Sequence, residues 1–187
     1  MQRRLTIRAK ILWIALAINA LCTASYTVNS YYQQRQAYLE GVDQKLLAAA
    51  RVLPLMIPVN FHAQIKGAES ISPDRHNQLM KLLSSYADSI RLAYLYSYMQ
   101  FDGKFYVSTT SATKEEFATH KETPFFKMYE SPPDSMIKAW KTDSVQYDEY
   151  KDEWGHFRSI FIPMKTTDGT RFIVGADVSL GLSLIHI

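Results

Sequence analysis

The stretch YLYSYMQFDGKFYVST, residues 94–109, decides the fold of this chain. Arg91 to Gln100 is rich in tyrosine, an aromatic residue that favours strands. Asp102-Gly103 is a tight-turn dipeptide, and a second strand-like run returns from Phe105 to Thr109. The pattern predicts an antiparallel β-hairpin.

Further strands are expected after this hairpin. A polar helical stretch runs from Thr113 to Lys121, and another lies around Asp134 to Lys141 after two prolines. Turn-like segments at Trp154-Gly155 and at residues 167–169 then separate strand-like runs. The three predicted strands are Val145–Tyr150, His156–Met164 and Phe172–Ser179. Together with the hairpin they predict an antiparallel sheet of about five strands.

Helices are expected before the hairpin. From Tyr31 to Val52 apolar residues recur at helical spacing, with no proline and one glycine. Pro54 and Pro58 are expected to stop this helix, because the proline ring nitrogen cannot donate a hydrogen bond. Ser72-Pro73 begins a second helix, with serine as the N-cap and proline at the first helical position.

An apolar run without a charged side chain occupies Ile11 to Val28. At a rise of about 1.5 Å per residue, about eighteen residues just span a hydrocarbon core of about 30 Å. Basic residues remain on the cytoplasmic side of a membrane, and the segment before the run carries four of them and no acidic residue. We therefore expect a cytoplasmic tail (1–10), a transmembrane helix (11–29) and an extracytoplasmic domain (30–181). A cleavable signal peptide with its cleavage site near Cys22 is the alternative.

Charge and composition exclude several function classes. Four of the 21 lysines and arginines lie in the first ten residues, which leaves 17 basic against 18 acidic residues in the rest. The basic excess therefore indicates membrane topology, and no nucleic-acid partner is expected. Four of the five histidines, at 62, 76, 120 and 156, are scattered without metal spacing, and motifs of hydrolases and phosphate-binding enzymes are absent. We expect no catalytic residue, metal or cofactor in this chain, although an output domain beyond it could be enzymatic.

The last six residues, LSLIHI at 182–187, are letter for letter the translation of CTGTCTCTTATACACATCT. That string resembles the end sequence ligated on by transposase-based library preparation. We therefore expect this segment to be an artefact and the native chain to continue differently after Gly181. The alternative is that these residues begin a second apolar helix.

The order helix, helix, two strands, helical insertion and three strands is that of a PAS-like sheet with a long N-terminal helix on its back. The chain resembles the extracytoplasmic Cache (PDC-type) sensor domains of bacterial receptors. The resemblance rests on Tyr94-Leu95-Tyr96, on Asp102-Gly103 and on the closing run 174–180, VGADVSL; residues 148–159 and 161–163 also look like chemoreceptor sensors. It covers about residues 33–180 and implies an α+β single Cache fold.

Five residues are candidates for contacting a small ligand. Alternate residues of a strand share a face, so Tyr94, Tyr96 and Tyr98 line one side of the first strand. In the last strand, Phe172, Val174, Ala176 and Val178 are expected to pack on the long helix, and Asp177 faces away from it. A solute pocket needs aromatic walls and a few polar groups. The candidates are Tyr96, Tyr147, Tyr150, Arg158 and Asp177.

Two of the candidates have specific expected roles. The resemblance implies that Asp177 can meet a ligand amine, and Arg158 can bind a carboxylate in bidentate fashion. The alternatives are that Arg158 and Asp177 pair with each other across neighbouring strands, and that the tyrosines form a half-buried sheet surface.

The sequence thus predicts the ligand-sensing input module of a truncated receptor in the bacterial inner membrane. The expected ligand is an amino acid, an organic acid or an amine, bound in the periplasm or outside the cell. The resemblance favours a methyl-accepting chemotaxis output, with a histidine kinase or diguanylate cyclase next, and a homodimer formed through residues 32–53. The alternative is a membrane-anchored periplasmic binding or structural protein without a signalling output.

Overall fold

The structure is a computed structural model that describes residues 6–152 and 155–180. The chain divides into two compact units, Met1–Gly41 and Val42–Ile187. The first helix, α1 (Ile7–Met56), contributes to both units. The predicted Trp154 turn, the basic residues Arg3 and Arg4, and the segment 182–187 lie outside the described residues, at least in part.

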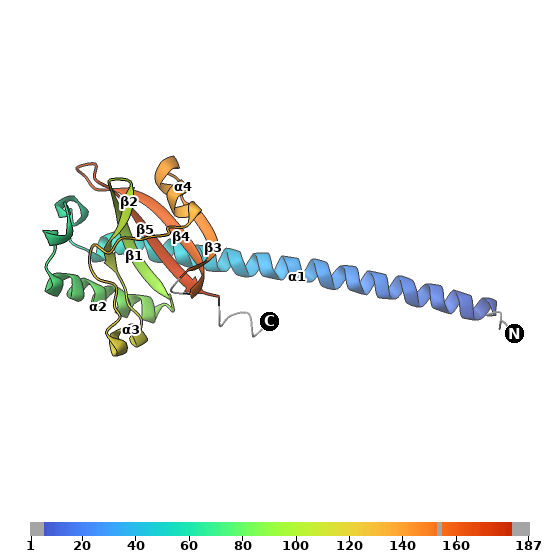
Figure 1. The fold of residues 1–187 in the computed structure, drawn as a ribbon. Coiled ribbons are helices and arrows are strands. Elements are labelled where there is room, and N and C mark those ends of the chain that lie inside the picture. Colours follow the sequence, from blue (N-terminus) through green and yellow to red (C-terminus); the bar gives the residue numbers. More distant parts are fainter. Residues whose placement is uncertain (1–5, 153–154, 181–187) are drawn as a thin grey trace. The chain divides into compact units, whose positions relative to one another are not determined.

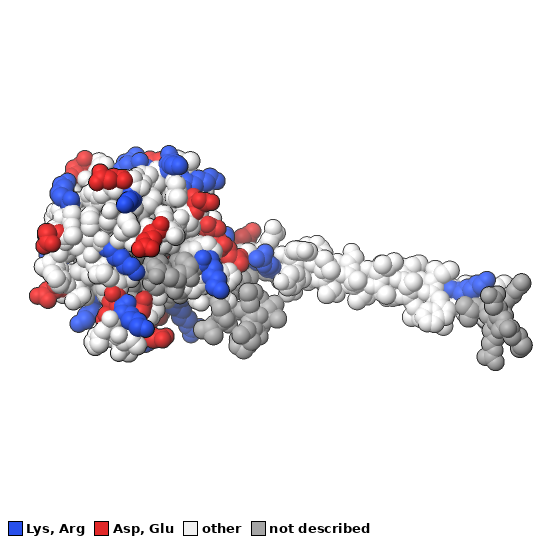
Figure 2. Space-filling model, in the orientation of Figure 1, with Lys and Arg blue, Asp and Glu red and all other residues white. Residues whose placement is uncertain are grey.

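The first unit consists of the N-terminal part of α1. This helix is long and apolar enough to cross a membrane by length and composition, a test that a signal sequence near the N-terminus also passes. None of its 18-residue apolar window is buried, and large side chains such as Trp13 and Leu21 are exposed. Figure 2 shows a long stretch of this part of α1 without charged side chains, between basic residues near its two ends.

The second unit is an α+β domain built on one five-stranded sheet, as predicted (Figure 1). The strands follow the order β2-β1-β5-β4-β3, and every neighbouring pair is antiparallel. Their bounds are β1 Tyr94–Phe101, β2 Lys104–Thr110, β3 Gln146–Asp152, β4 Gly155–Lys165 and β5 Arg171–Ser179. The last strand in the sequence lies in the centre of the sheet, next to the first.

One face of the sheet packs against helices α1 and α2 (Pro73–Ser89). The second half of α1 buries Leu46, Ala50 and Leu53. On the sheet, Val174 and Ala176 are fully buried, and Leu95 and Ile160 pair with Ala176 in register on the two neighbouring strands. Residues that pair directly across strands share a face, so these side chains form one apolar layer under the helices.

The ends of the two helices follow from local chemistry. Ser72 caps α2 by accepting a hydrogen bond from the Arg75 backbone N–H at 3.3 Å, with Pro73 at the first position, as predicted. The first helix does not stop at Pro54 but continues to Met56. A single proline removes only its own backbone N–H donor, so the N–H groups of the residues that follow can still form helical hydrogen bonds. The Ile57 N–H, for example, donates to the Leu53 carbonyl at 3.3 Å.

The opposite face of the sheet is covered by α4 (Asp134–Thr142) and the irregular segment 120–133. The short helix α3 (Lys114–Thr119) buries no residue and is joined to this side by the Tyr94 hydroxyl, which donates to Glu116 Oε1 at 3.3 Å. Side chains from this cover and from the sheet form one apolar cluster that includes Tyr98, Phe105, Tyr129, Met136, Phe161 and Ile173. At the C-terminal end of α4, the Nζ of Lys165 on β4 donates a hydrogen bond to Oδ2 of Asp143 at 2.8 Å, which connects the helix to the sheet. The guanidinium of Arg171 also lies 4.3 Å from the ring centre of Trp140.

Candidate ligand-binding site

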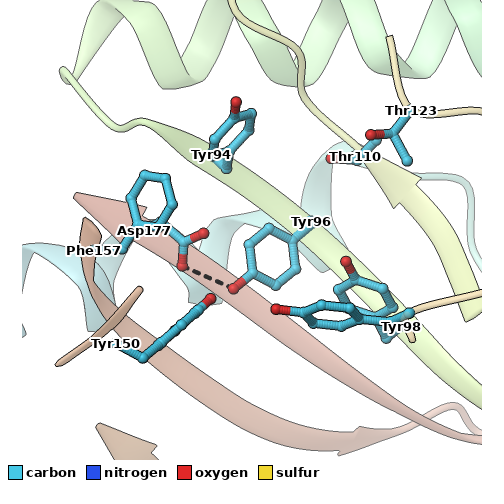
Figure 3. Close-up of a pocket in the computed structure, with 9 residues that line it drawn as sticks. Tyr94, Tyr96, Tyr98, Thr110, Thr123, Tyr150, Phe157 and Asp177 are labelled. Atoms are coloured by element: carbon cyan, nitrogen blue, oxygen red, sulfur yellow. Dashed lines mark hydrogen bonds between the residues drawn. The ribbon is translucent and has the colours of Figure 1, made fainter. Parts of the chain in front are cut away.

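A small pocket lies between the covered face of the sheet and the segment 120–133 (Figure 3). Its cavity volume is about 30 Å³, which is similar to the volume that one molecule occupies in liquid water. Nine residues line it: Tyr94, Tyr96, Tyr98, Thr110, Thr123, Tyr129, Tyr150, Phe157 and Asp177. They come from all five strands of the sheet and from the segment 120–133.

The carboxylate of Asp177 is the polar centre of this pocket. Asp177 is 3% exposed, and its Oδ1 accepts a hydrogen bond of 2.8 Å from the hydroxyl of Tyr96 (Figure 3). Burial, followed by the negative charge of Asp177, raises the pKa of Tyr96 well above its usual value. Tyr96 therefore stays protonated at neutral pH and can donate this hydrogen bond.

Gly175 makes the position of Tyr96 possible. The two residues pair directly across β1 and β5, so both face the pocket side of the sheet. A Cβ atom at Gly175 would lie 2.0 Å from Cε2 and 2.5 Å from Cζ of the Tyr96 ring. The ring thus occupies the space that any other residue type at position 175 would fill.

Aromatic rings form the walls of the pocket. Tyr96 and Tyr98 meet edge to face with ring centres 5.3 Å apart, and Tyr98 stacks on Tyr129 at 5.3 Å. Phe157 meets Tyr94 at 5.8 Å and Tyr150 at 6.4 Å. Tyr96 and Tyr98 are 6% and 7% exposed, so these two members of the predicted tyrosine row are buried, whereas Tyr94 is partly buried.

Three of the five candidate residues, Tyr96, Tyr150 and Asp177, line this pocket together. Arg158 and Tyr147 do not. In the register of β4 and β5, Ser159 pairs with Asp177 and Arg158 pairs with Val178. Because successive residues of a strand point to opposite faces, Arg158 lies on the helix side of the sheet.

Arg158 has a different partner there. Its Nε and Nη2 donate to the two carboxylate oxygens of Asp43 on α1, at 2.8 and 2.7 Å. This hydrogen-bonded carboxylate raises the pKa of Arg158. Tyr147 lies beside it, with its ring centre 5.7 Å from the guanidinium carbon. The expectation that Arg158 pairs with Asp177 is wrong because it placed the two residues on one face of the sheet.

Sequence reasoning missed several lining residues. Phe157 follows from the alternation of β4, because it shares a face with Ser159 and Phe161. Thr123 and Tyr129 lie in the segment 120–133, which is irregular and has no periodic pattern from which a face can be read. Their position is fixed instead by backbone bonds to β2, such as Tyr129 N–H to the Phe105 carbonyl at 2.8 Å.

The side chains that line the pocket are of types suited to binding a small molecule. Within the described ranges 6–152 and 155–180, no group of three or more histidine, cysteine, aspartate or glutamate side chains is placed to hold a metal ion. The lining offers aromatic faces, two threonines and one carboxylate. Such a surface is suited to orient a small solute with an apolar body and a polar end.

Known proteins resemble this chain in structure and not in sequence. No protein-family model matches it, and no curated protein matches it. The sensory domain of the Campylobacter jejuni chemoreceptor Tlp3 (CcmL) is 16% identical, with a TM-score of 0.47, over 77% of this chain and 54% of that chain. The same domain with isoleucine bound is 15% identical, with a TM-score of 0.46, over 77% and 53%.

A third similar structure is the ligand-binding domain of the Pseudomonas aeruginosa PAO1 amino acid chemoreceptor PctC in complex with GABA. It is 12% identical, with a TM-score of 0.35, over 77% of this chain and 65% of that chain. This chain spans about half the length of the Tlp3 structures that it matches.

Proposed function

We propose that this chain is the ligand-sensing input module of a membrane signal-transduction receptor, and that its second unit binds a small solute outside the cytoplasm. The observation that carries the proposal is the pocket around Asp177: a buried carboxylate inside an aromatic wall. A pocket of this kind offers a small solute ring faces for its apolar body and a polar group that fixes its orientation.

The small size of the cavity indicates that ligand binding is coupled to a conformational change. A volume of about 30 Å³ is too small for a solute as large as an amino acid, which is several times the size of a water molecule. Binding therefore requires the lining to open, either by movement of Tyr96 away from Asp177 or by displacement of the segment 120–133. A ligand that binds the opened form better shifts the protein toward it, which is the energetic requirement for a sensor.

A path for such a shift leads through the sheet to α1. Asp177 on β5 pairs with Ser159 on β4, and the next residue along β4 is Arg158. Arg158 holds Asp43 of α1 by its bidentate bond. Movement of β4 and β5 at the pocket is thereby transmitted to a helix that runs continuously from Asp43 into the apolar segment.

The membrane arrangement follows from the charges. The basic tail and the apolar helix support an arrangement with residues 1–10 in the cytoplasm, 11–29 in the inner membrane and 30–181 outside the cytoplasm. The module works as a homodimer through residues 32–53, and a chemotaxis-type output is favoured over a histidine kinase or a diguanylate cyclase. The visible chain itself is not an enzyme.

The gene sequence beyond the codon for Gly181 tests the receptor assignment. Amplification of the locus from genomic DNA avoids library-end sequence. We expect a second apolar helix followed by a HAMP-like segment. A stop codon directly after Gly181 would instead support the anchored periplasmic protein.

A ligand screen tests the binding function. The full chain in lipid nanodiscs is scanned by thermal unfolding against amino acids, organic acids and amines. We expect at least one compound to raise the melting temperature of the protein, and Asp177→Asn to abolish that rise. Asp88→Asn, at an exposed carboxylate paired with Lys114, is the matched control and should keep it. A rise that survives Asp177→Asn unchanged places the site elsewhere.

A further inference from the structure

We propose that a groove along α2 is a second binding site of this chain, and that it binds a short peptide with free termini. The groove is distinct from the pocket around Asp177, because Thr123 is the only described residue that lines both. Its volume is about 630 Å³, within the range of about 300–1,000 Å³ that is usual for ligand sites.

The groove lies between α2 and the stretch of chain that includes α3 and the start of the segment 120–133. In the second half of α2, the Oγ of Ser84 accepts a hydrogen bond of 2.8 Å from the Ala112 N–H. Nearer the start of α2, the Nε2 of His76 donates to the Thr123 carbonyl at 3.1 Å. The stretch therefore runs antiparallel to α2, and the groove extends along the helix axis.

Several apolar side chains line the groove. Ile71 and Met80 are 6% and 1% exposed, and Phe117 and Phe125 are half-buried. The ring of His76 also lines the groove, with its centre 5.9 Å from that of Phe125. Burial lowers the pKa of His76, so this ring is neutral at pH 7 and adds no charge. Such a surface can bind the apolar side chains of a ligand.

Acidic and basic side chains lie at different places along the groove. Glu69 precedes Pro73, the first residue of α2, by four positions, and Glu122 is next to Thr123. Lys81 lies eight residues after Pro73, about 12 Å further along the helix axis. No hydrogen bond or ion pair within the described part of the chain engages these acidic and basic side chains. The groove is thus acidic toward the start of α2 and basic further along it.

A short peptide complements this arrangement of charges. Its terminal ammonium and carboxylate lie at opposite ends, and three extended residues span at most about 10–11 Å. A single amino acid holds both charged groups on one carbon and cannot reach both ends of the groove. The amide of Asn77 lines the groove between the ends and can both donate to and accept from a peptide group. The charges orient the peptide with its C-terminus at Lys81.

Isothermal titration of the full chain in nanodiscs at low ionic strength tests this proposal with the tripeptide alanyl-phenylalanyl-alanine as the probe. We expect the free tripeptide to bind, and phenylalanine to bind at least about tenfold more weakly because it makes fewer apolar contacts and reaches one end only. Amidation of the C-terminus or acetylation of the N-terminus removes one charge. Each change should weaken binding about threefold or more.

Variants of the groove assign each end of the peptide. Lys81→Met should weaken binding of the free tripeptide about threefold and have no further effect on the amidated form. Glu69→Gln combined with Glu122→Gln should weaken the free tripeptide similarly and have no further effect on the acetylated form. The matched controls Lys138→Met and Glu130→Gln, at exposed residues outside the groove, should leave binding unchanged.

Three outcomes would overturn the inference. A tripeptide that does not bind, or binds no more tightly than phenylalanine, excludes a peptide site. Equal affinities of the free, amidated and acetylated forms exclude recognition of the termini. Binding that Lys81→Met leaves unchanged, or weakens equally for the free and amidated forms, excludes the assigned groove or orientation. Asp177 does not line the groove, so none of these outcomes decides the proposed sensing function, which the ligand screen tests separately.

Discussion

Replacement of Gly175 by alanine is the sharpest structural perturbation of the pocket. The φ angle of Gly175 is not in the left-handed region, so the backbone accepts alanine without strain. The new Cβ would, however, lie 2.0, 2.5 and 2.8 Å from Cε2, Cζ and the hydroxyl oxygen of Tyr96. These separations are far below the 3.5–4.0 Å of optimal carbon contacts. The Tyr96 ring must therefore leave its place.

The cost of this movement can be worked out from what Tyr96 loses. Overpacking a well-packed core costs about 1–3 kcal/mol, and the hydrogen bond from the Tyr96 hydroxyl to the buried Asp177 carboxylate contributes about 1.5–3 kcal/mol. Partial relaxation makes the sum smaller than the two separate terms. We expect Gly175→Ala to lower the free energy of unfolding by about 2–4 kcal/mol, which lowers the melting temperature by about 4–16 °C.

Thermal unfolding of the full chain in nanodiscs, followed by circular dichroism, measures this loss. Gly41→Ala is the matched control, because a Cβ there meets no atom within 4 Å and alanine is the better helix former. In a Tyr96→Ser background the ring is absent, so Gly175→Ala should cost less than about 0.5 kcal/mol. A wild-type melting temperature for Gly175→Ala, or the same loss in both backgrounds, would refute the placement of Tyr96 over Gly175.

Three further predictions concern the rest of the domain. Burial lowers the pKa of His62 from 6.5 to about 3, so the unfolded chain takes up the proton first and stability is lost as the pH falls from about 6.5 toward 3. Between pH 7 and pH 5 this residue should lower the free energy of unfolding by about 2 kcal/mol. Urea unfolding at both pH values should show a smaller decrease for His62→Gln than for the wild-type chain. An equal decrease in the two proteins contradicts the prediction. The side chains of Arg158 and Asp43, which form an ion pair, are 17% and 20% exposed. A double-mutant cycle of Arg158→Gln and Asp43→Asn should give a coupling energy of about 1.5–3 kcal/mol. A coupling energy below about 0.5 kcal/mol contradicts a stabilising role for this pair. Thr113→Ala removes the N-cap of α3, where the threonine hydroxyl accepts from the Glu116 N–H at 3.2 Å, and should cost about 1 kcal/mol in thermal unfolding, whereas a loss near zero would show that this cap does not stabilise the domain.

Local patterns in the sequence predict most of the sheet. The alternation and turn dipeptide of residues 94–109 specify the β1–β2 hairpin, and the period of two in β5 indicates which of its residues face the helices, although both faces of this strand are buried. Alternation within β1 and β5 also predicts the face on which Tyr96 and Asp177 lie, and in the structure the two side chains are hydrogen-bonded to each other. These features depend on neighbours along the chain, which a sequence displays.

The partner of Arg158 could not be predicted in this way. Its position relative to Asp177 depends on the register between β4 and β5, and a shift of one residue moves a side chain to the other face. Asp43 lies 115 positions away in the sequence, on a helix whose packing angle no local pattern specifies. The position of Tyr129 in the pocket could not be predicted either, because this residue lies in a segment without periodic secondary structure.

Hydrogen exchange of the full chain in nanodiscs, with and without a saturating concentration of the compound that raises its melting temperature most, tests the sensing account most directly. The account predicts altered amide protection both in β5 around Asp177 and in α1 around Asp43. It also predicts that Arg158→Gln keeps the first change and loses the second, because Arg158 joins β4 to α1. Binding that alters protection only around the pocket, and leaves α1 unchanged in the wild-type chain, would contradict the account.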